Sequence, residues 1–425
     1  MEPAASTWSR SEGWRYGLLG LPLAFVALPL YVILPNHYAR EFGVPLAWLG
    51  AVLLGARLLD ALIDPVIGRL SDSLFARSAR AVLVFGGLAC GVLALGFALL
   101  FFPPMRDVSG LLLWSSVMLM MTYAAFSAIS VAHQSWGAML GGGALAQSRI
   151  VAWREGLGLL GVVLASVTPA LMGMPFTVGL FWLMLGLGWL AWCRARQPRS
   201  LALSGSSRTV PPLGLPFMRP AFRRLLAVFV VNGIASAVPA TLVLFFVQDR
   251  LQAPQALEPV FLGTFFLCAA LSMPLWLLLV RRIGLARAWL CGMLLAVAVF
   301  IWASQLGAGQ VLAFGIISAL SGLALGADLG LPAALLAGVI ADAGDQGQAE
   351  GRYFGWWNFA TKLNLALAAG VVLPLLAFFG YAPGARDAQA LEALTLTYCL
   401  LPCALKLVAA SLLYTLVIRR EAVHA

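Results

Sequence analysis

Long apolar runs separated by short polar segments dominate the chain. Each run is long enough for a transmembrane helix, which needs about 20 apolar residues. The runs cover residues 16–36, 45–68, 81–102, 109–136, 150–171, 174–194, 223–247, 257–280, 286–305, 308–339, 354–380 and 391–417. The pattern therefore predicts an all-α polytopic membrane protein with twelve transmembrane helices.

A basic segment rich in Pro, Gly and Ser separates the sixth apolar run from the seventh. It predicts an N-terminal six-helix half at residues 1–196, a cytoplasmic linker at 197–222 and a C-terminal six-helix half at 223–425. Two pseudo-symmetric halves joined in this way resemble the layout of major facilitator transporters. That resemblance implies a substrate site near the membrane midplane, between halves that rock around it.

Composition supports the same class of protein. The chain is 62% hydrophobic and only 10% charged, whereas a soluble domain is about 25% charged. The net charge of +10 comes from arginines clustered in alternate loops, which is the positive-inside pattern and not a nucleic-acid surface. We therefore expect a multi-pass inner-membrane protein with both termini in the cytoplasm.

Catalytic and cofactor motifs are missing from the sequence. The six cysteines form no CxxC pair, and the three histidines have no metal-ligand spacing. We find no phosphate-binding loop, no nucleophile motif and no selectivity-filter sequence. The sequence thus predicts no enzyme and no cofactor, and transport must draw on a gradient or on the solute itself.

The segment RLLDALIDPVIGRLSD at residues 57–72 carries the strongest signal. Asp60 and Asp64 lie one helical turn apart, and Arg57 can share their face of the helix. An acid at the bilayer centre costs roughly 2.5–3.5 kcal/mol, so two are expected to line a watery cavity. There they can bind Na⁺, through carboxylate oxygens, or H⁺. The alternative is an internal ion pair with Arg57 that only fixes helix packing.

Three stretches resemble the glycoside–pentoside–hexuronide cation symporters, a family of the major facilitator superfamily. They are ARLLDALIDPVIGRLSD (56–72), QSRIVAWREG (147–156), and LPAALLAGVIAD with EGRYFGWWNFATKLNLALAAG (331–342 and 350–370). The resemblance implies cation-coupled uptake of a small sugar. It also implies that Asp60 and Asp64 hold the coupling ion, that Lys362 links ion and solute sites, and that Trp153 and Arg154 lie on the substrate side.

The first helix departs from that family. The sugar-binding acid on the first helix of that family corresponds to Ala24 here, and the acid on the family's fourth helix corresponds to His133. Cation coupling therefore has more support than a sugar substrate, and Na⁺ and H⁺ are supported equally. An apolar first helix also suits an amphipathic or lipid-like solute. A non-transporting sensor or scaffold is a further alternative, against which the intramembrane charges argue.

Several polar or aromatic residues inside apolar runs are candidates for solute contact. They are His133, Gln134, Trp136, Asp328, Trp357 and Asn358. For His133 the alternative is a hydrogen bond within the bundle, and for Asp328 it is a structural role near Pro332. Lys362 is expected to face a counter-ion or cavity, and its alternative is to snorkel. Lys406, near the end of its run, is expected to snorkel to the interface.

Charged residues at the expected cytoplasmic ends predict a gate. Asp72 is expected to form a latch with Arg77 and Arg80, as in the loop motif of the superfamily. Asp342 and the charges that follow it, including Arg352, are expected to form gating pairs, with solvated loop charge as the alternative. The expected partners are a small-molecule solute and membrane lipids, and the expected assembly is a monomer.

Overall fold

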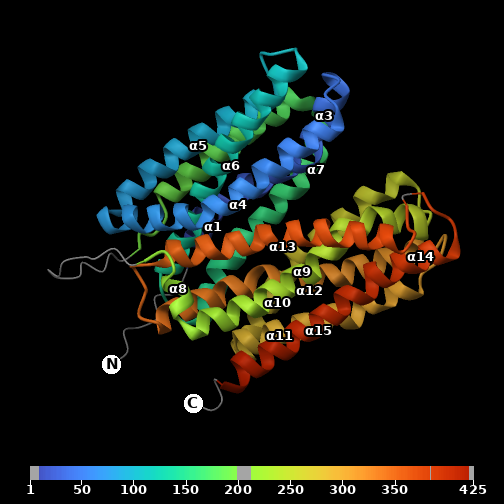
Figure 1. The fold of residues 1–425 in the computed structure, drawn as a ribbon. Helices are drawn as coiled ribbons and strands as arrows, with labels where there is room; N and C mark the ends of the chain where they lie inside the picture. Colours follow the sequence, from blue (N-terminus) through green and yellow to red (C-terminus); the bar gives the residue numbers. More distant parts are fainter. Residues whose placement is uncertain (1–8, 199–211, 383, 421–425) are drawn as a thin grey trace. The chain divides into compact units, whose positions relative to one another are not determined.

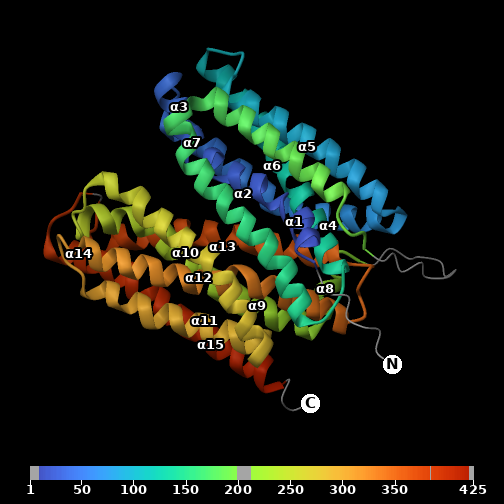
Figure 2. The same ribbon diagram turned by 180° about the vertical axis from the view of Figure 1, so that it is seen from behind.

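The computed structural model describes residues 9–198, 212–382 and 384–420 of the chain. Every regular element in these residues is a helix (Figures 1 and 2). The α-helices are α1 (Arg10–Gly17), α2 (Gly20–Leu28), α3 (Leu34–Glu41), α4 (Leu46–Arg77), α5 (Ala79–Phe101), α6 (Val108–Met139), α7 (Ala144–Cys193), α8 (Leu215–Met218), α9 (Pro220–Phe245), α10 (Glu258–Ile283), α11 (Leu285–Phe300), α12 (Val311–Asp342), α13 (Glu350–Phe378), α14 (Ala388–Thr395) and α15 (Leu401–Leu413).

Short π- or 3₁₀-helical turns extend or connect several of these helices. They are η1 (Pro29–Ile33), η2 (Phe246–Arg250), η3 (Gln255–Leu257), η4 (Ile301–Gln305), η5 (Leu396–Leu400) and η6 (Tyr414–Ile418).

Ten helices in the described residues are long and apolar enough to cross a membrane. They match the third to twelfth apolar runs, so the prediction of a polytopic all-α membrane protein is confirmed. The first two runs are helical as well. One is formed by α2, η1 and α3 in succession, and the other is α4. Helix α4 carries Arg57, Asp60 and Asp64 within its apolar run.

Gly173 separates the fifth and sixth spans inside α7. Its φ of 77° and ψ of 169° lie outside the helical region, and only glycine adopts such a backbone without strain. The two spans on either side are Ala144–Pro169 and Leu171–Cys193. The predicted boundary between the helices at 150–171 and 174–194 therefore falls at this break.

The described chain forms two compact units. Unit 1 comprises residues 1–218 and 337–359, and unit 2 comprises residues 219–336 and 360–425. The end of α12 and the start of α13 thus pack with the N-terminal helices. Residues 199–211 of the predicted linker lie outside the described residues. The division into halves at 1–196, 197–222 and 223–425 stays a prediction.

In unit 1, glycines bring the first helices close to α7. A Cβ at Gly13 would overlap the indole of Trp153, and one at Gly17 would lie 2.7 Å from the carbonyl oxygen of Trp153. At Gly20 the distance to the carbonyl oxygen of Arg154 would be 2.5 Å. The spacing of these glycines places them on one helix face, and the absence of side chains there permits close helix packing.

Unit 2 has its own apolar core. Phe246, Phe261, Phe314 and Tyr398 belong to one buried cluster, in which the rings of Phe246 and Tyr398 stack 4.3 Å apart. Glycines again set the helix contacts. A Cβ at Gly322 of α12 would overlap the carbonyl oxygen of Phe265 in α10. This close packing fixes the segment of α12 that carries Asp328.

Candidate functional site

The acidic pair lies on α4, which packs against α6 within unit 1. Asp60 is 5% exposed, and its Oδ1 accepts a hydrogen bond of 2.9 Å from the Oγ of Ser127. Tyr123, one helical turn before Ser127, neighbours both Arg57 and Asp60. Asp64 is fully buried. The acids therefore face the protein interior and not lipid, as their desolvation cost requires.

Ser127 was not among the residues singled out from the sequence. Serine is common in membrane helices, where its hydroxyl usually bonds the preceding turn of the same helix. Only the pairing of α4 with α6 reveals that this hydroxyl points at Asp60. With Asp60 and Asp64 it brings a third oxygen-bearing side chain to the same region of α4.

The start of α13 packs tightly against the acidic segment of α4. A Cβ at Gly68 would overlap the carbonyl oxygen of Gly351, and a Cβ at Gly351 would overlap that of Gly68. A Cβ at Gly355 would lie 2.6 Å from the carbonyl oxygen of Asp64 and 3.0 Å from the Cα of Pro65. This pairing of two backbones holds the stretch of α4 from Asp64 to Gly68 against α13.

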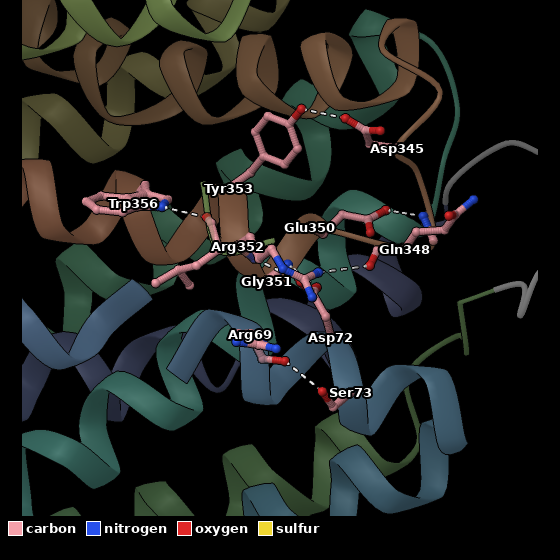
Figure 3. A network of polar contacts seen from close by, with 12 residues as sticks. Arg69, Asp72, Ser73, Asp345, Gln348, Glu350, Gly351, Arg352, Tyr353 and Trp356 are labelled. Carbon is pink, nitrogen blue, oxygen red and sulfur yellow. Dashed lines mark hydrogen bonds and ion pairs between the residues drawn. The ribbon is translucent and has the colours of Figure 1, made fainter. Parts of the chain in front are cut away.

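Asp72, at the end of this contact, binds the first turn of α13 (Figure 3). Its Oδ1 accepts from the backbone N–H of Gly351 at 2.6 Å. Its Oδ2 accepts from the backbone N–H of Arg352 at 3.2 Å and from the guanidinium Nη1 of Arg352 at 2.6 Å. A carboxylate at a helix N-terminus satisfies free N–H groups and complements the helix dipole. Asp72 therefore both caps α13 and pairs with its arginine.

The observed partner of Asp72 differs from the one predicted. Arg77 and Arg80 are exposed, and Asp342 is exposed at the end of α12. Arg352, which was grouped with the gating charges, is 1% exposed and forms the ion pair. Arg77 and Arg80 follow Asp72 by five and eight positions, so they are near in sequence. The tight contact between Gly68 and Gly351 brings Arg352 nearer in space.

The turn between α12 and α13 is itself held by acids (Figure 3). The Oη of Tyr353 donates to Oδ2 of Asp345 at 2.6 Å. The Oε1 of Glu350 accepts from the backbone N–H of Gly347 at 2.6 Å. Glu350 is also fully buried. These bonds fix the turn that presents Gly351 and Arg352 to Asp72.

Replacing Asp72 with asparagine is expected to lower the free energy of unfolding by about 3–5 kcal/mol, because it leaves the buried charge of Arg352 without its partner. Thermal or denaturant unfolding of the purified protein measures this. The double variant Asp72→Asn/Arg352→Gln should recover part of the loss, and Arg77→Gln, at an exposed site, should stay within about 0.5 kcal/mol of the parent. Equal stability of Asp72→Asn and the parent would contradict the pairing.

Arg154 lies in α7 beside the first helix. Its Nε and Nη2 both donate to Oε1 of Glu155, at 2.9 and 2.5 Å. The guanidinium also lies close to the hydroxyl of Tyr16. The resemblance implies a substrate-side role for Arg154, which Glu155 follows directly in the chain. Their contact makes the two residues a single ion-paired unit.

His133 of α6 is fully buried and engages Tyr16 of α1. The hydroxyl of Tyr16 donates to the carbonyl oxygen of His133 at 3.0 Å, and Nε2 of His133 lies 2.9 Å from the carbonyl oxygen of Tyr16. The two rings stack with centroids 4.3 Å apart. His133 thus forms a hydrogen bond within the helix bundle, which the sequence analysis gave as the alternative to solute contact.

The remaining candidates in unit 1 are scattered. Trp136 is fully buried, donates from Nε1 to the carbonyl oxygen of Arg196 and packs against Phe75 and Trp192. Trp357 is buried in α13, whereas Gln134, Trp153 and Asn358 are partly exposed. Their roles as solute contacts stay predictions.

The two lysines of the chain lie in unit 2. Lys362 is partly exposed in α13. Lys406 is 7% exposed in α15, where its Nζ donates to Oδ2 of Asp328 at 2.6 Å. The prediction that Lys406 snorkels to the interface is wrong. The helical segment continues through η6 to Ile418, so the lysine lies within the span and is neutralised by an acid from α12.

No group of three or more His, Cys, Asp or Glu side chains within residues 9–198, 212–382 and 384–420 is placed to hold a metal ion. Asp60, Asp64 and Ser127 offer oxygen atoms of another kind. Carboxylate and hydroxyl oxygens suit a hard cation, and a carboxylate suits a proton.

Comparison with known proteins identifies the class. The chain resembles a bacterial homologue of the iron transporter ferroportin in its outward-facing state, with a TM-score of 0.70 and 15% identity over 96% of this chain and 99% of that one. The human organic anion transporter MFSD10 matches with a TM-score of 0.66 and 18% identity, over 95% of this chain and 100% of that one. The major facilitator transporter FucP in its outward conformation matches with a TM-score of 0.64 and 17% identity, over 95% of this chain and 99% of that one. These likenesses show that the chain has the major facilitator fold.

The family follows from sequence. Residues 15–420 match the family model described as MFS/sugar transport protein, and the chain belongs to that family. It is 24% identical to the "uncharacterized symporter YjmB" of Bacillus subtilis (strain 168), over 97% of this chain and 94% of the relative. It is also 24% identical to the "inner membrane symporter YicJ" of Escherichia coli (strain K12), over 36% of this chain and 33% of the relative.

Proposed function

We propose that this protein is a cation-coupled symporter that carries a small solute, a glycoside or another small sugar, by alternating access. The observation that carries the proposal is the pair Asp60 and Asp64. Both acids are buried in a membrane protein, and Asp60 is bonded to the hydroxyl of Ser127. Membership of a sugar-transport family and two relatives named as symporters support it.

In the proposed cycle, Na⁺ or H⁺ binds at Asp60 and Asp64 and relieves the repulsion between the two carboxylates. The neutralised site favours the solute-competent cavity, and Lys362 links the occupancy of the two sites. Linkage requires that cation and solute raise each other's affinity by the same factor. The transporter then crosses between its two open states with both ligands bound.

The contact of Asp72 with Gly351 and Arg352 serves as the cytoplasmic gate in this proposal. Opening must break three hydrogen bonds and separate the backbones at Gly68 and Gly351. Hydration of the freed carboxylate and guanidinium offsets the free energy lost when these contacts break. The proposed setting is the inner membrane, with both termini in the cytoplasm and the protein working as a monomer.

A second candidate solute is an amphipathic or lipid-like molecule. It is favoured by the apolar first helix, in which Ala24 stands at the position of the family's sugar-binding acid and lies against α7 near Gly158. Such a solute needs apolar contact more than hydrogen bonds. The coupling site at Asp60 and Asp64 is the same in both proposals.

The test is thermal unfolding of the purified protein with a panel of glycosides, sugar acids and lysophospholipids, each with and without Na⁺ at two pH values. A ligand that binds only the folded state raises the midpoint, by RT ln(1 + [L]/Kd) in free energy. We expect one glycoside to raise it, more strongly with Na⁺ or at one pH. Shifts confined to lysophospholipids would favour the second candidate. Shifts independent of both cation and pH would contradict a symporter.

A further inference from the structure

Unit 2 contains a buried ion pair that the transport mechanism above does not use. Lys406 of α15 donates from Nζ to Oδ2 of Asp328 at 2.6 Å and to Oγ of Ser236 at 3.0 Å. The side chains of the pair are 9% and 10% exposed. The other oxygen of Asp328 accepts from Nδ2 of Asn232 at 3.1 Å and from Nε1 of Trp289 at 2.9 Å. Four helices, α9, α11, α12 and α15, thus meet at one carboxylate.

Asn232 leaves an acceptor unused at this centre. The residue is 4% exposed, and its Oδ1 is buried without a hydrogen-bond partner. The orientation of the amide is set by Asp328, because only the NH₂ end can face a carboxylate. The carbonyl end therefore stays within the buried centre, where an unpaired acceptor costs about 1–3 kcal/mol.

The oxygens around this pair have the character of a cation site. One is a carboxylate oxygen from α12, and two are the hydroxyl and amide oxygens of Ser236 and Asn232 in α9. Hard cations such as Na⁺ take oxygen ligands of these kinds. The ammonium of Lys406 carries the same single charge and already binds two of the three residues.

We propose that Lys406 is a tethered cation that permanently fills an oxygen-lined, monovalent-cation site in unit 2. The lysine supplies from within the chain the charge that an alkali ion or an alkylammonium ion would otherwise supply. Unit 2 therefore needs no ion from solution to keep Asp328 neutralised. A vacated site in a Lys406 variant takes up Na⁺ or a small primary ammonium instead.

The test is chemical rescue of Lys406→Ala, followed by thermal unfolding at constant ionic strength in choline chloride, NaCl or n-propylammonium chloride. Loss of one partner from a buried pair should lower the midpoint by about 5–10 °C in choline. Na⁺ or propylammonium should restore at least half of that loss. The double variant Lys406→Ala/Asp328→Asn keeps the acids of α4 and removes the proposed site, so it should show only the cation response of unit 1.

The variant Lys406→Gln keeps most of the side-chain volume and serves if Lys406→Ala does not fold in any of the buffers. The proposal is supported if Na⁺ or propylammonium raises the midpoint of either single variant more than that of its double variant with Asp328→Asn. A folded single variant that responds no more than its double overturns it. This outcome is independent of solute transport, so it also stands apart from any failure of the proposed symport.

Discussion

Replacing Asp60 with asparagine is expected to abolish gradient-driven accumulation of the solute while leaving solute exchange in place. The amide keeps the size of the carboxylate and its bond to Ser127, but it removes the charge that binds Na⁺ or H⁺. Without a bound cation the gradient does no work on the solute. In proteoliposomes the accumulation ratio should fall to unity, whereas exchange of labelled for unlabelled solute should continue.

The matched control is Asp107→Asn. Asp107 is an exposed acid that caps α6 by accepting from the backbone N–H of Gly110, and asparagine caps a helix equally well. This variant should accumulate solute like the parent. Normal accumulation by Asp60→Asn would remove the carboxylate from the coupling mechanism. Loss of exchange as well as accumulation would instead assign Asp60 to solute binding.

Leucine at Gly351 is expected to prevent the pairing of α4 with α13. A Cβ at this position overlaps the carbonyl oxygen of Gly68 and lies 2.7 Å from Oδ1 of Asp72. Neither backbone can give way without breaking the cap that Asp72 forms. Overpacking of a tight contact costs about 1–3 kcal/mol. The loss of the buried pair adds about 3–5 kcal/mol to the closed state, so we expect a lower yield of folded protein and a lower midpoint of thermal unfolding, with the folded fraction held in the gate-open state.

Gly370 offers the matched control in the same helix. It is exposed, and a Cβ there would meet nothing within 4 Å. Gly370→Leu should keep or raise the stability, since leucine favours a helix over glycine by somewhat under 1 kcal/mol. Yield in detergent and the midpoint of thermal unfolding measure both variants. If the two behave alike, helix propensity and not the contact with α4 governs this position.

The fold was predictable from hydropathy because the bilayer imposes long apolar helices. The break at Gly173 fell at the predicted boundary for a local reason, since Pro169 and Pro175 flank a glycine that adopts a positive φ. The acids of α4 were predictable for a related reason, because a charge within a span demands an explanation. Both signals lie within a single helix and need no knowledge of its neighbours.

Partners were less predictable because they depend on which helices meet. The hydrogen bond from Ser127 to Asp60 could not be predicted, because it depends on the packing of α6 against α4. Asp72 was matched to Arg77 and Arg80, which are close in sequence, and not to Arg352, which a glycine contact brings close in space. Lys406 was assigned to the interface because it lies near the end of its apolar run, and its acidic partner comes from α12, 78 residues earlier in the chain.

The polarity of α4 bears on how the protein is made. Arg57, Asp60 and Asp64 make it a poor candidate to enter lipid alone, at about 2.5–3.5 kcal/mol for each charge near the centre. Its hydroxyl partner, Ser127, emerges 67 residues after Asp60. At 5–20 residues per second this separation lasts about 3–13 s. During biogenesis we therefore expect α4 to remain beside the insertion machinery and to enter the membrane together with α6.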